Sequence, residues 1–125
     1  ALEVVKTRLE EACRMIQVKE IAEPWLPSKP ERQTQINCFG YEYAGFPRKI
    51  EAVFGDGILE LVWILTGKAE EDRVRGALVE AYGPMESQGE DYEVFAGGRV
   101  ALRKDKPEVL MLSETQVPLY QDELQ

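Results

Sequence analysis

The chain contains no histidine and only two cysteines among its 125 residues. Without an imidazole there is no histidine-based catalytic triad, no histidine metal ligand and no general base with an ordinary pKa near neutrality. Two cysteines alone do not complete a zinc site, and Gly97-Gly98 lies between two expected strands instead of opening a phosphate-binding helix. We therefore expect no metal, no cofactor and no enzymatic activity.

Positive charge and long apolar runs are also scarce. The 15 Lys and Arg residues face 23 Asp and Glu residues, which leaves a net charge of −8. This charge repels phosphate backbones, so we expect no nucleic-acid partner. The longest apolar run, residues 58–65, is interrupted by Glu60 and is shorter than the ~18 residues that cross a bilayer. We expect no membrane span.

Length and apolar content favour a single domain. A chain of this size with 44% apolar residues can form one hydrophobic core. We expect residues 1–125 to be that domain, with a tail at 114–125. Because no capping Ser, Thr, Asp or Asn precedes the first helical residues, we also expect the natural chain to extend upstream of Ala1.

Two segments have the spacing of amphipathic helices. Apolar residues recur at intervals of three and four over residues 2–17 and 69–82, and Gly83-Pro84 ends the second segment. A connector with three prolines, residues 22–35, follows the first helix. Alternating or continuous apolar runs predict strands at residues 35–43, 49–54, 58–66, 92–96, 99–104 and 108–113.

The two expected helices have related sequences. Val5 to Ala12, VKTRLEEA, and Val74 to Ala81, VRGALVEA, share four of eight residues. The chain is either a duplication of α-β-β-β units, at 2–66 and 69–113, or a chance likeness of two amphipathic helices. In both cases each helix needs a sheet against which to bury its apolar stripe. We predict an α+β fold with two helices on one face of a largely antiparallel sheet of about six strands.

This order of helices and antiparallel strands resembles that of the secreted β-lactamase inhibitor proteins. The segment from Val74 to Met85, VRGALVEAYGPM, is similar to the helix-ending pattern of the small outer-membrane assembly lipoproteins of the SmpA/OmlA type. The likeness covers the order of elements across most of the chain and one short motif. It implies a protein-binding module without catalysis.

The two cysteines are placed so that both can face the same interior. Cys13 lies on the apolar stripe of the first helix, and Cys38 alternates with Ile36 on one face of the first strand. One interpretation is a disulfide bond, which would place the protein outside the reducing cytoplasm, in the periplasm or the extracellular medium. The other is a pair of buried free thiols in a cytoplasmic protein.

The first expected strand carries an aromatic series. If Cys38 faces the helices, then Phe39, Tyr41 and Tyr43 share the opposite face, provided that Gly40 does not form a bulge that reverses the alternation. The strand at 58–66 is apolar on both faces, although a sheet under one layer of helices needs only one apolar face. The second face is covered either by a partner or by other parts of the chain. Those parts are the connector with Trp25 and Leu26, or the tail around Val117, Leu119 and Tyr120.

We predict from these features a non-enzymatic binding module, located outside the cytoplasm, that contacts a protein partner or a second copy through the aromatic face. The candidate partner-binding residues are Trp25, Phe39, Tyr41, Tyr43 and Phe46. The alternative is a cytoplasmic small-ligand-binding protein or enzyme subunit, with a pocket between the proline-rich connector and the sheet.

Overall fold

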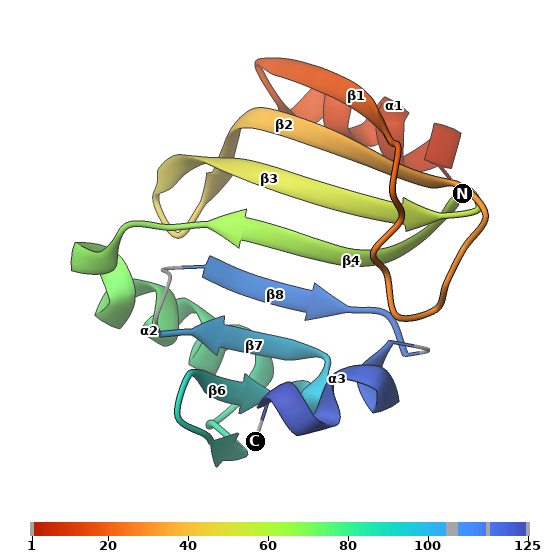
Figure 1. The fold of residues 1–125 in the computed structure, drawn as a ribbon. Helices are drawn as coiled ribbons and strands as arrows, with labels where there is room; N and C mark the ends of the chain where they lie inside the picture. Colours follow the sequence, from red (N-terminus) through yellow and green to blue (C-terminus); the bar gives the residue numbers. More distant parts are fainter. Residues whose placement is uncertain (1, 105–107, 115, 125) are drawn as a thin grey trace.

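The computed structural model describes residues 2–104, 108–114 and 116–124, with all their side chains except those of residues 46, 68 and 121–124. In these ranges, eight strands form one antiparallel sheet in the order β1-β2-β3-β4-β8-β7-β6-β5, accompanied by three α-helices (Figure 1). The strands are β1 (Met15–Ile21), β2 (Gln33–Tyr43), β3 (Phe46–Gly55), β4 (Ile58–Leu65), β5 (Ser87–Gln88), β6 (Tyr92–Phe95), β7 (Val100–Arg103) and β8 (Glu108–Leu112). The helices are α1 (Leu2–Ala12), α2 (Glu71–Tyr82) and α3 (Val117–Leu124), with short 3-10 turns η1 (Lys68–Glu70) and η2 (Ala96–Gly98).

The expectation of about six strands with two helices on one face is wrong, because three further elements form. α1 ends at Ala12, and β1 occupies the last residues expected for the first helix, 15–17, together with residues 18–21, which lie before the connector. Ile16 fits a helical spacing, but it also alternates with Val18, and seven consecutive pairs with β2 decide in favour of the strand. β5 forms inside an expected loop, and α3 forms inside the expected tail.

Within the described ranges, each half of the chain begins with a helix that is followed by four strands, and α3 comes after the second set. α1 precedes β1 to β4, α2 precedes β5 to β8, and the last strands of the two halves, β4 and β8, pair with each other. Both helices begin three residues before the related valine, α1 at Leu2 before Val5 and α2 at Glu71 before Val74. The order of elements in each half therefore starts α-β-β-β-β, instead of the expected α-β-β-β.

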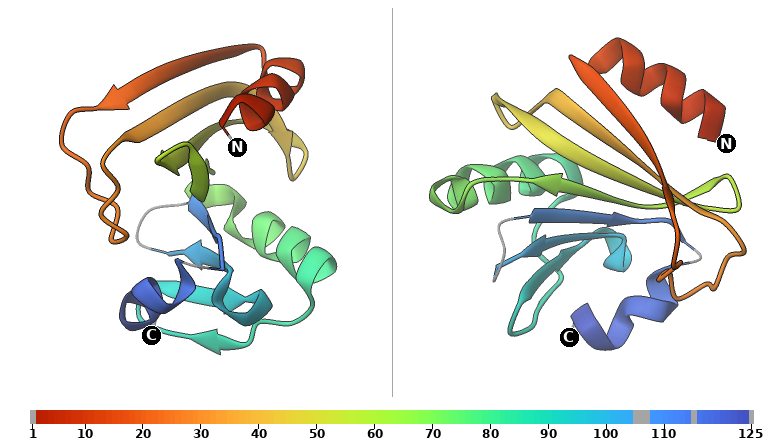
Figure 2. Two further views of the ribbon diagram at one scale, coloured as in Figure 1. Left: turned by 90° about the vertical axis from the view of Figure 1, so that its right-hand side faces the viewer. Right: turned by 45° about the horizontal axis from the view of Figure 1, so that its top comes forward.

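The two faces of the sheet are covered differently. α1 and α2 contact one face, here called the helix face, where Ile36, Ile64 and Val109 are buried. The sheet curves away from these helices, so its other face is hollow (Figure 2); we call it the concave face. The connector, residues 22–32, and α3 lie on the concave side. Their Leu26 and Tyr120 are buried there in one apolar cluster with residues of the sheet.

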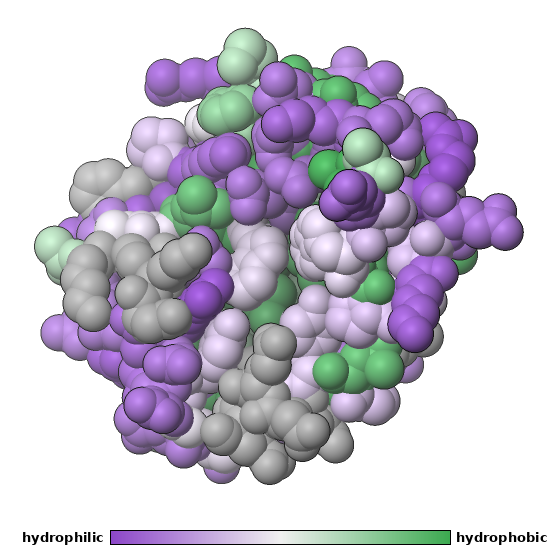
Figure 3. Space-filling view, in the orientation of Figure 1, coloured by the Kyte–Doolittle hydropathy of each residue, from purple (hydrophilic) through white to green (hydrophobic). Residues whose placement is uncertain are grey.

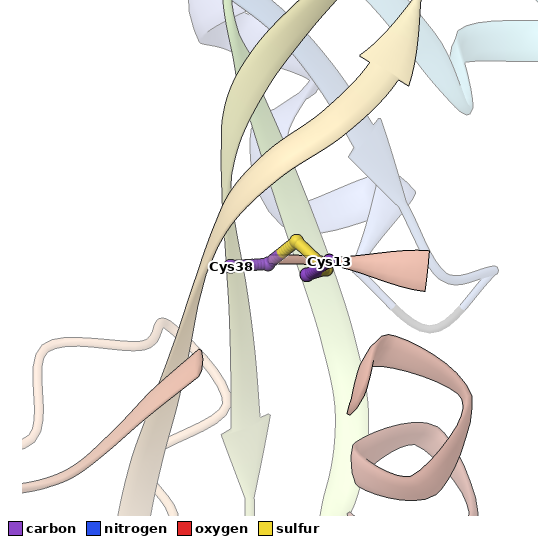
Figure 4. The surroundings of a disulfide bond; sticks show 2 residues. All are labelled: Cys13 and Cys38. Carbon is purple, nitrogen blue, oxygen red and sulfur yellow. A yellow bond between two sulfur atoms is a disulfide. The ribbon is translucent and has the colours of Figure 1, made fainter. Parts of the chain in front are cut away.

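A disulfide bond joins Cys13, in the turn between α1 and β1, to Cys38 on β2 (Figure 4). The two Cα atoms are 5.8 Å apart, which is an ordinary separation for a disulfide. Cys38 has no exposed surface. Of the two interpretations of the cysteines, the structure therefore contains the bonded pair, and this bond fastens the start of β1 to its neighbour in the sheet.

Candidate functional site

The aromatic series of β2 is divided between the two faces of the sheet. Phe39 pairs with Lys49, but Tyr41 pairs with Arg48, the next residue of β3, so Gly40 is an extra residue in the strand. Its φ of 86° lies in the region that glycine adopts without a Cβ clash. Phe39 therefore faces the concave side, while Tyr41 and Tyr43 pack against the cluster under α2. Gly40 thus forms the bulge that the expectation of a shared face required to be absent, and the three aromatic residues do not share one face.

The tyrosines on the helix face lie beside a partly buried ion pair between Arg48 and Glu70. Arg48 donates from Nη1 to Oε1 of Glu70 at 2.7 Å, and its Nη2 lies 2.6 Å from the other carboxylate oxygen. Arg48 Nε also donates to the backbone oxygen of Tyr43 at 3.0 Å. The hydrogen bond from Arg48 holds the pKa of Glu70 below its usual value, whereas burial raises the pKa of Tyr43. These contacts join the β2–β3 hairpin to the start of α2, which is a structural role.

A continuous series of contacts crosses the concave face from β2 to β7. The ammonium of Lys49 lies 5.6 Å from the centre of the Phe39 ring and 3.1 Å from the carboxylate of Glu51. Glu51 is the cross-strand neighbour of Trp63. The guanidinium of Arg103 lies 5.7 Å from the Trp63 ring. We call these five residues, Phe39, Lys49, Glu51, Trp63 and Arg103, the aromatic surface.

The aromatic surface is the part of the concave face that surrounds two half-buried rings, Phe39 and Trp63. The face carries hydrophobic and weakly polar residues at its centre and hydrophilic residues at its margins (Figure 3). Each ring has a cation at a distance typical of cation–π contacts. Both cations also have a carboxylate nearby: Lys49 lies 3.1 Å from Glu51, and Arg103 lies 3.7 Å from Glu108. The surface thus combines apolar area with charges that are already paired.

Glu60 limits how much of the concave face stays open. Its carboxylate accepts hydrogen bonds from Ser28 of the connector at 2.9 Å and from Gln116, just before α3, at 3.1 Å. Gln33, which is fully buried, accepts the backbone N–H of Leu26 at 3.0 Å. These bonds hold both covering segments on the concave face, and Trp63 packs at the border of the apolar cluster that they cover.

The remaining candidates, Trp25 and Phe46, make no described contact with the aromatic surface. Trp25 is 49% exposed on the connector, and its backbone N–H is bound to Gln33. The backbone of Phe46 pairs with Tyr43, and its side chain lies outside the described residues. Sequence reasoning did not select Trp63, although the two-sided apolar pattern of its strand was a signal. A register shift between Val53 and Phe54 changes which residues of β4 share a face with Trp63, and no sequence pattern reveals it.

A second group of charges links α2 to β6. Arg75 binds both carboxylate oxygens of Glu93, which raises the pKa of Arg75 and lowers that of Glu93. Glu93 is 4% exposed, so this pair is structural. Within the described ranges, no three Cys, Asp or Glu side chains are grouped in a way that could hold a metal ion. The described helices are also too short or too polar to cross a membrane.

Comparisons of the chain with family models, with curated proteins and with solved structures found no match.

Proposed function

We propose that this chain is a non-enzymatic binding module that contacts a protein partner through the aromatic surface. The observation that carries the proposal is that each half-buried ring on the hollow face has a cation beside it: Lys49 near Phe39, and Arg103 near Trp63, at the border of the cluster that the connector and α3 cover. Trp and Arg are the residue types most enriched among binding hot spots, because they bury large areas and retain a polar contact.

The arrangement of charge supports a protein as the partner. Lys49 and Arg103 each lie near a carboxylate, at 3.1 Å and 3.7 Å. A partner can therefore cover the rings without leaving an unpaired charge buried, which is the costly outcome at an interface. A hollow face also offers more contact area to a convex partner than a flat one does.

The disulfide supports a location outside the cytoplasm. Disulfides persist in oxidising compartments and are rare among cytoplasmic proteins. We place the binding module in the periplasm or the extracellular medium on this ground.

The alternative of a small-ligand pocket between connector and sheet has less support. Leu26 is 2% exposed and Gln33 is 0% exposed, so these side chains fill the space that such a pocket would need. The hydrogen bond between them closes it further.

Site-specific photo-crosslinking in the native host tests the proposal. A photoreactive phenylalanine analogue is placed at Phe39 or at Lys49, and in a control chain at Val79, which is 42% exposed on α2. We expect a covalent adduct with one protein from both concave-face positions and none from Val79. Absence of an adduct at both concave-face positions, or the same adduct from Val79, would show that the aromatic surface is not the contact.

A further inference from the structure

The outer edge of β1 is available for pairing. β1 is the first strand in the sheet order, and within the described residues only β2 pairs with it. Its seven pairs with β2 contain no register shift, and it has no proline. A strand of this kind presents regularly spaced N–H and C=O groups to solvent. The opposite edge strand, β5, is only two residues long.

The disulfide keeps the edge strand β1 ordered before any segment binds to it. Free edge strands lose order readily, and a segment that must first become ordered binds more weakly. The bond between Cys13 and Cys38 holds the chain two residues before Met15, where β1 begins. β1 is therefore kept in register on its inner side while its outer side stays open.

A groove follows the same strand on the helix face. A cavity of about 550 Å³ lies between α1 and the sheet, with Leu2 and Lys6 on the α1 side and Val18 and Glu20 on the β1 side. Glu3, Thr34, Arg32 and Asp56 complete its polar lining. Val18 is 44% exposed at the groove. A strand added to β1 would direct alternate side chains to this side of the sheet, where the groove could receive one of them.

We propose that β1 and this groove bind an extended, positively charged segment of a partner protein, which adds to the sheet as a further antiparallel strand. In this mode the backbone bonds give affinity, and the groove selects the side chain. The surface is separate from the aromatic surface, so the inference goes beyond the proposed function.

Charge identifies the occupant. The groove is lined by three carboxylates, Glu3, Glu20 and Asp56, and by two cations, Lys6 and Arg32. Arg32 pairs with Glu20 at 2.8 Å, and the carboxylate of Asp56 accepts hydrogen bonds from the backbone N–H groups of Arg32 at 2.9 Å and of Glu31 at 3.4 Å, which leaves it negatively charged. A Lys or Arg of the added segment can lay its methylene groups on Leu2 and Val18 and bring its charge to Glu3 and Asp56. The net charge of −8 attracts such a segment at long range.

A second copy of the chain fits less well. Two copies with a charge of −8 repel each other, and the β1 segment carries one Lys and one Glu, so it supplies no net positive charge to its partner. The segment therefore comes from a different protein.

The probe is a nine-residue peptide of alternating threonine and valine, acetylated and amidated, with arginine at its centre. It is titrated into the disulfide-intact, isotope-labelled protein, and amide chemical shifts are recorded. We expect the largest shifts at β1 and at the groove-facing residues of α1. A peptide with glutamate at the centre should bind at least tenfold more weakly, and N-methylation of alternate peptide amides should abolish binding, because it removes backbone donors.

Matched protein variants locate the binding. Val18→Lys and Gln17→Lys each add one positive charge to β1, on the groove side and on the concave side respectively. We expect Val18→Lys to weaken peptide binding at least tenfold and Gln17→Lys by less than about twofold. Glu3→Gln should weaken it, and Lys6→Gln should strengthen it, each by about two- to fivefold, as exposed charges do. The aromatic-surface variant Trp63→Ala should leave it unchanged, which separates this inference from the proposed function.

Three results would overturn the inference. The first is no shift at β1 up to about 1 mM peptide. The second is equal binding of the arginine, glutamate and N-methylated peptides. The third is a peptide-independent dimer in sedimentation experiments that Val18→Lys dissociates, which would make a second copy the occupant.

Discussion

Arg75 on α2 donates two hydrogen bonds to the carboxylate of Glu93 on β6. Nε lies 2.7 Å from Oε1, and Nη2 lies 2.6 Å from Oε2. Arg75 also lies 2.7 Å from Asp72, which is 98% exposed. One arginine thus has a buried and an exposed acidic partner. The two partners provide a matched comparison of how burial changes the value of an ion pair.

Replacing Glu93 should destabilise the protein far more than replacing Asp72. Glu93→Ala removes the buried half of a two-bond pair, so we expect the free energy of unfolding to fall by about 2 kcal/mol. Asp72→Ala removes an exposed partner, and we expect a loss below about 0.5 kcal/mol. Urea denaturation of the parent protein and of the two variants at neutral pH measures both losses of unfolding free energy. Equal losses would mean that the Glu93 pair does not stabilise the link between α2 and β6.

The same pair predicts the direction of pH dependence. Arg75 lowers the pKa of Glu93 in the folded protein, so the folded state binds its proton less readily than the unfolded chain does. The stabilisation is present above the unfolded-state pKa of about 4.3 and is lost as the pH falls through the lower folded-state pKa. Urea denaturation between neutral and acidic pH should show this loss, and Glu93→Gln should have a flatter profile. A variant profile as steep as that of the parent protein would contradict the assignment.

Reducing the disulfide should weaken the whole fold and β1 most of all. Its loop of 25 residues corresponds to about 3.5 kcal/mol in the chain-entropy description. We expect denaturation with a reductant, or of the Cys13→Ser and Cys38→Ser double variant, to show a loss near this size. Hydrogen exchange should increase first at β1. Thiol titration of the denatured, unreduced protein should find no free thiol.

Tyr43 and Phe39 should respond differently to truncation, because they lie on opposite faces of the sheet. Tyr43 packs under α2 next to the Arg48 ion pair, so Tyr43→Ala should cost about 2 kcal/mol or more of stability. Phe39 is half-buried on the open concave face, and Phe39→Ala should cost less than about 1 kcal/mol. Thermal or urea unfolding distinguishes them. Similar losses for both would contradict the division that Gly40 produces.

Sequence periodicity identified the elements whose pattern is long and free of interruption. α2 lies within the predicted residues 69–82 and buries Val74 and Leu78 of its apolar stripe. The central strands β2, β3, β4, β6, β7 and β8 lie at their predicted places. β1 was missed because Ile16 fits both periods, and only its pairing with β2 favours the strand.

The candidate site was less predictable, because it depends on two register shifts. The extra residue at Gly40 reverses the alternation of β2, and the shift near Phe54 reassigns the faces of β4. Alternation in a sequence assumes an unbroken strand, so it cannot assign faces beyond such a point. Phe39 precedes the shift at Gly40 and faces away from α1 and α2, as the alternation with Cys38 predicts. Lys49, Trp63 and Arg103 come together only through cross-strand pairing.

Glu60 controls how much of the concave face is covered by the connector and by the segment before α3. One carboxylate fastens both the connector, through Ser28, and the segment before α3, through Gln116. A shorter or neutral side chain at this position would loosen both covers together and bare the apolar residues Leu61 and Leu112 beneath them. A single substitution, without any change to a strand, would thereby enlarge the part of the concave face that these two segments leave uncovered.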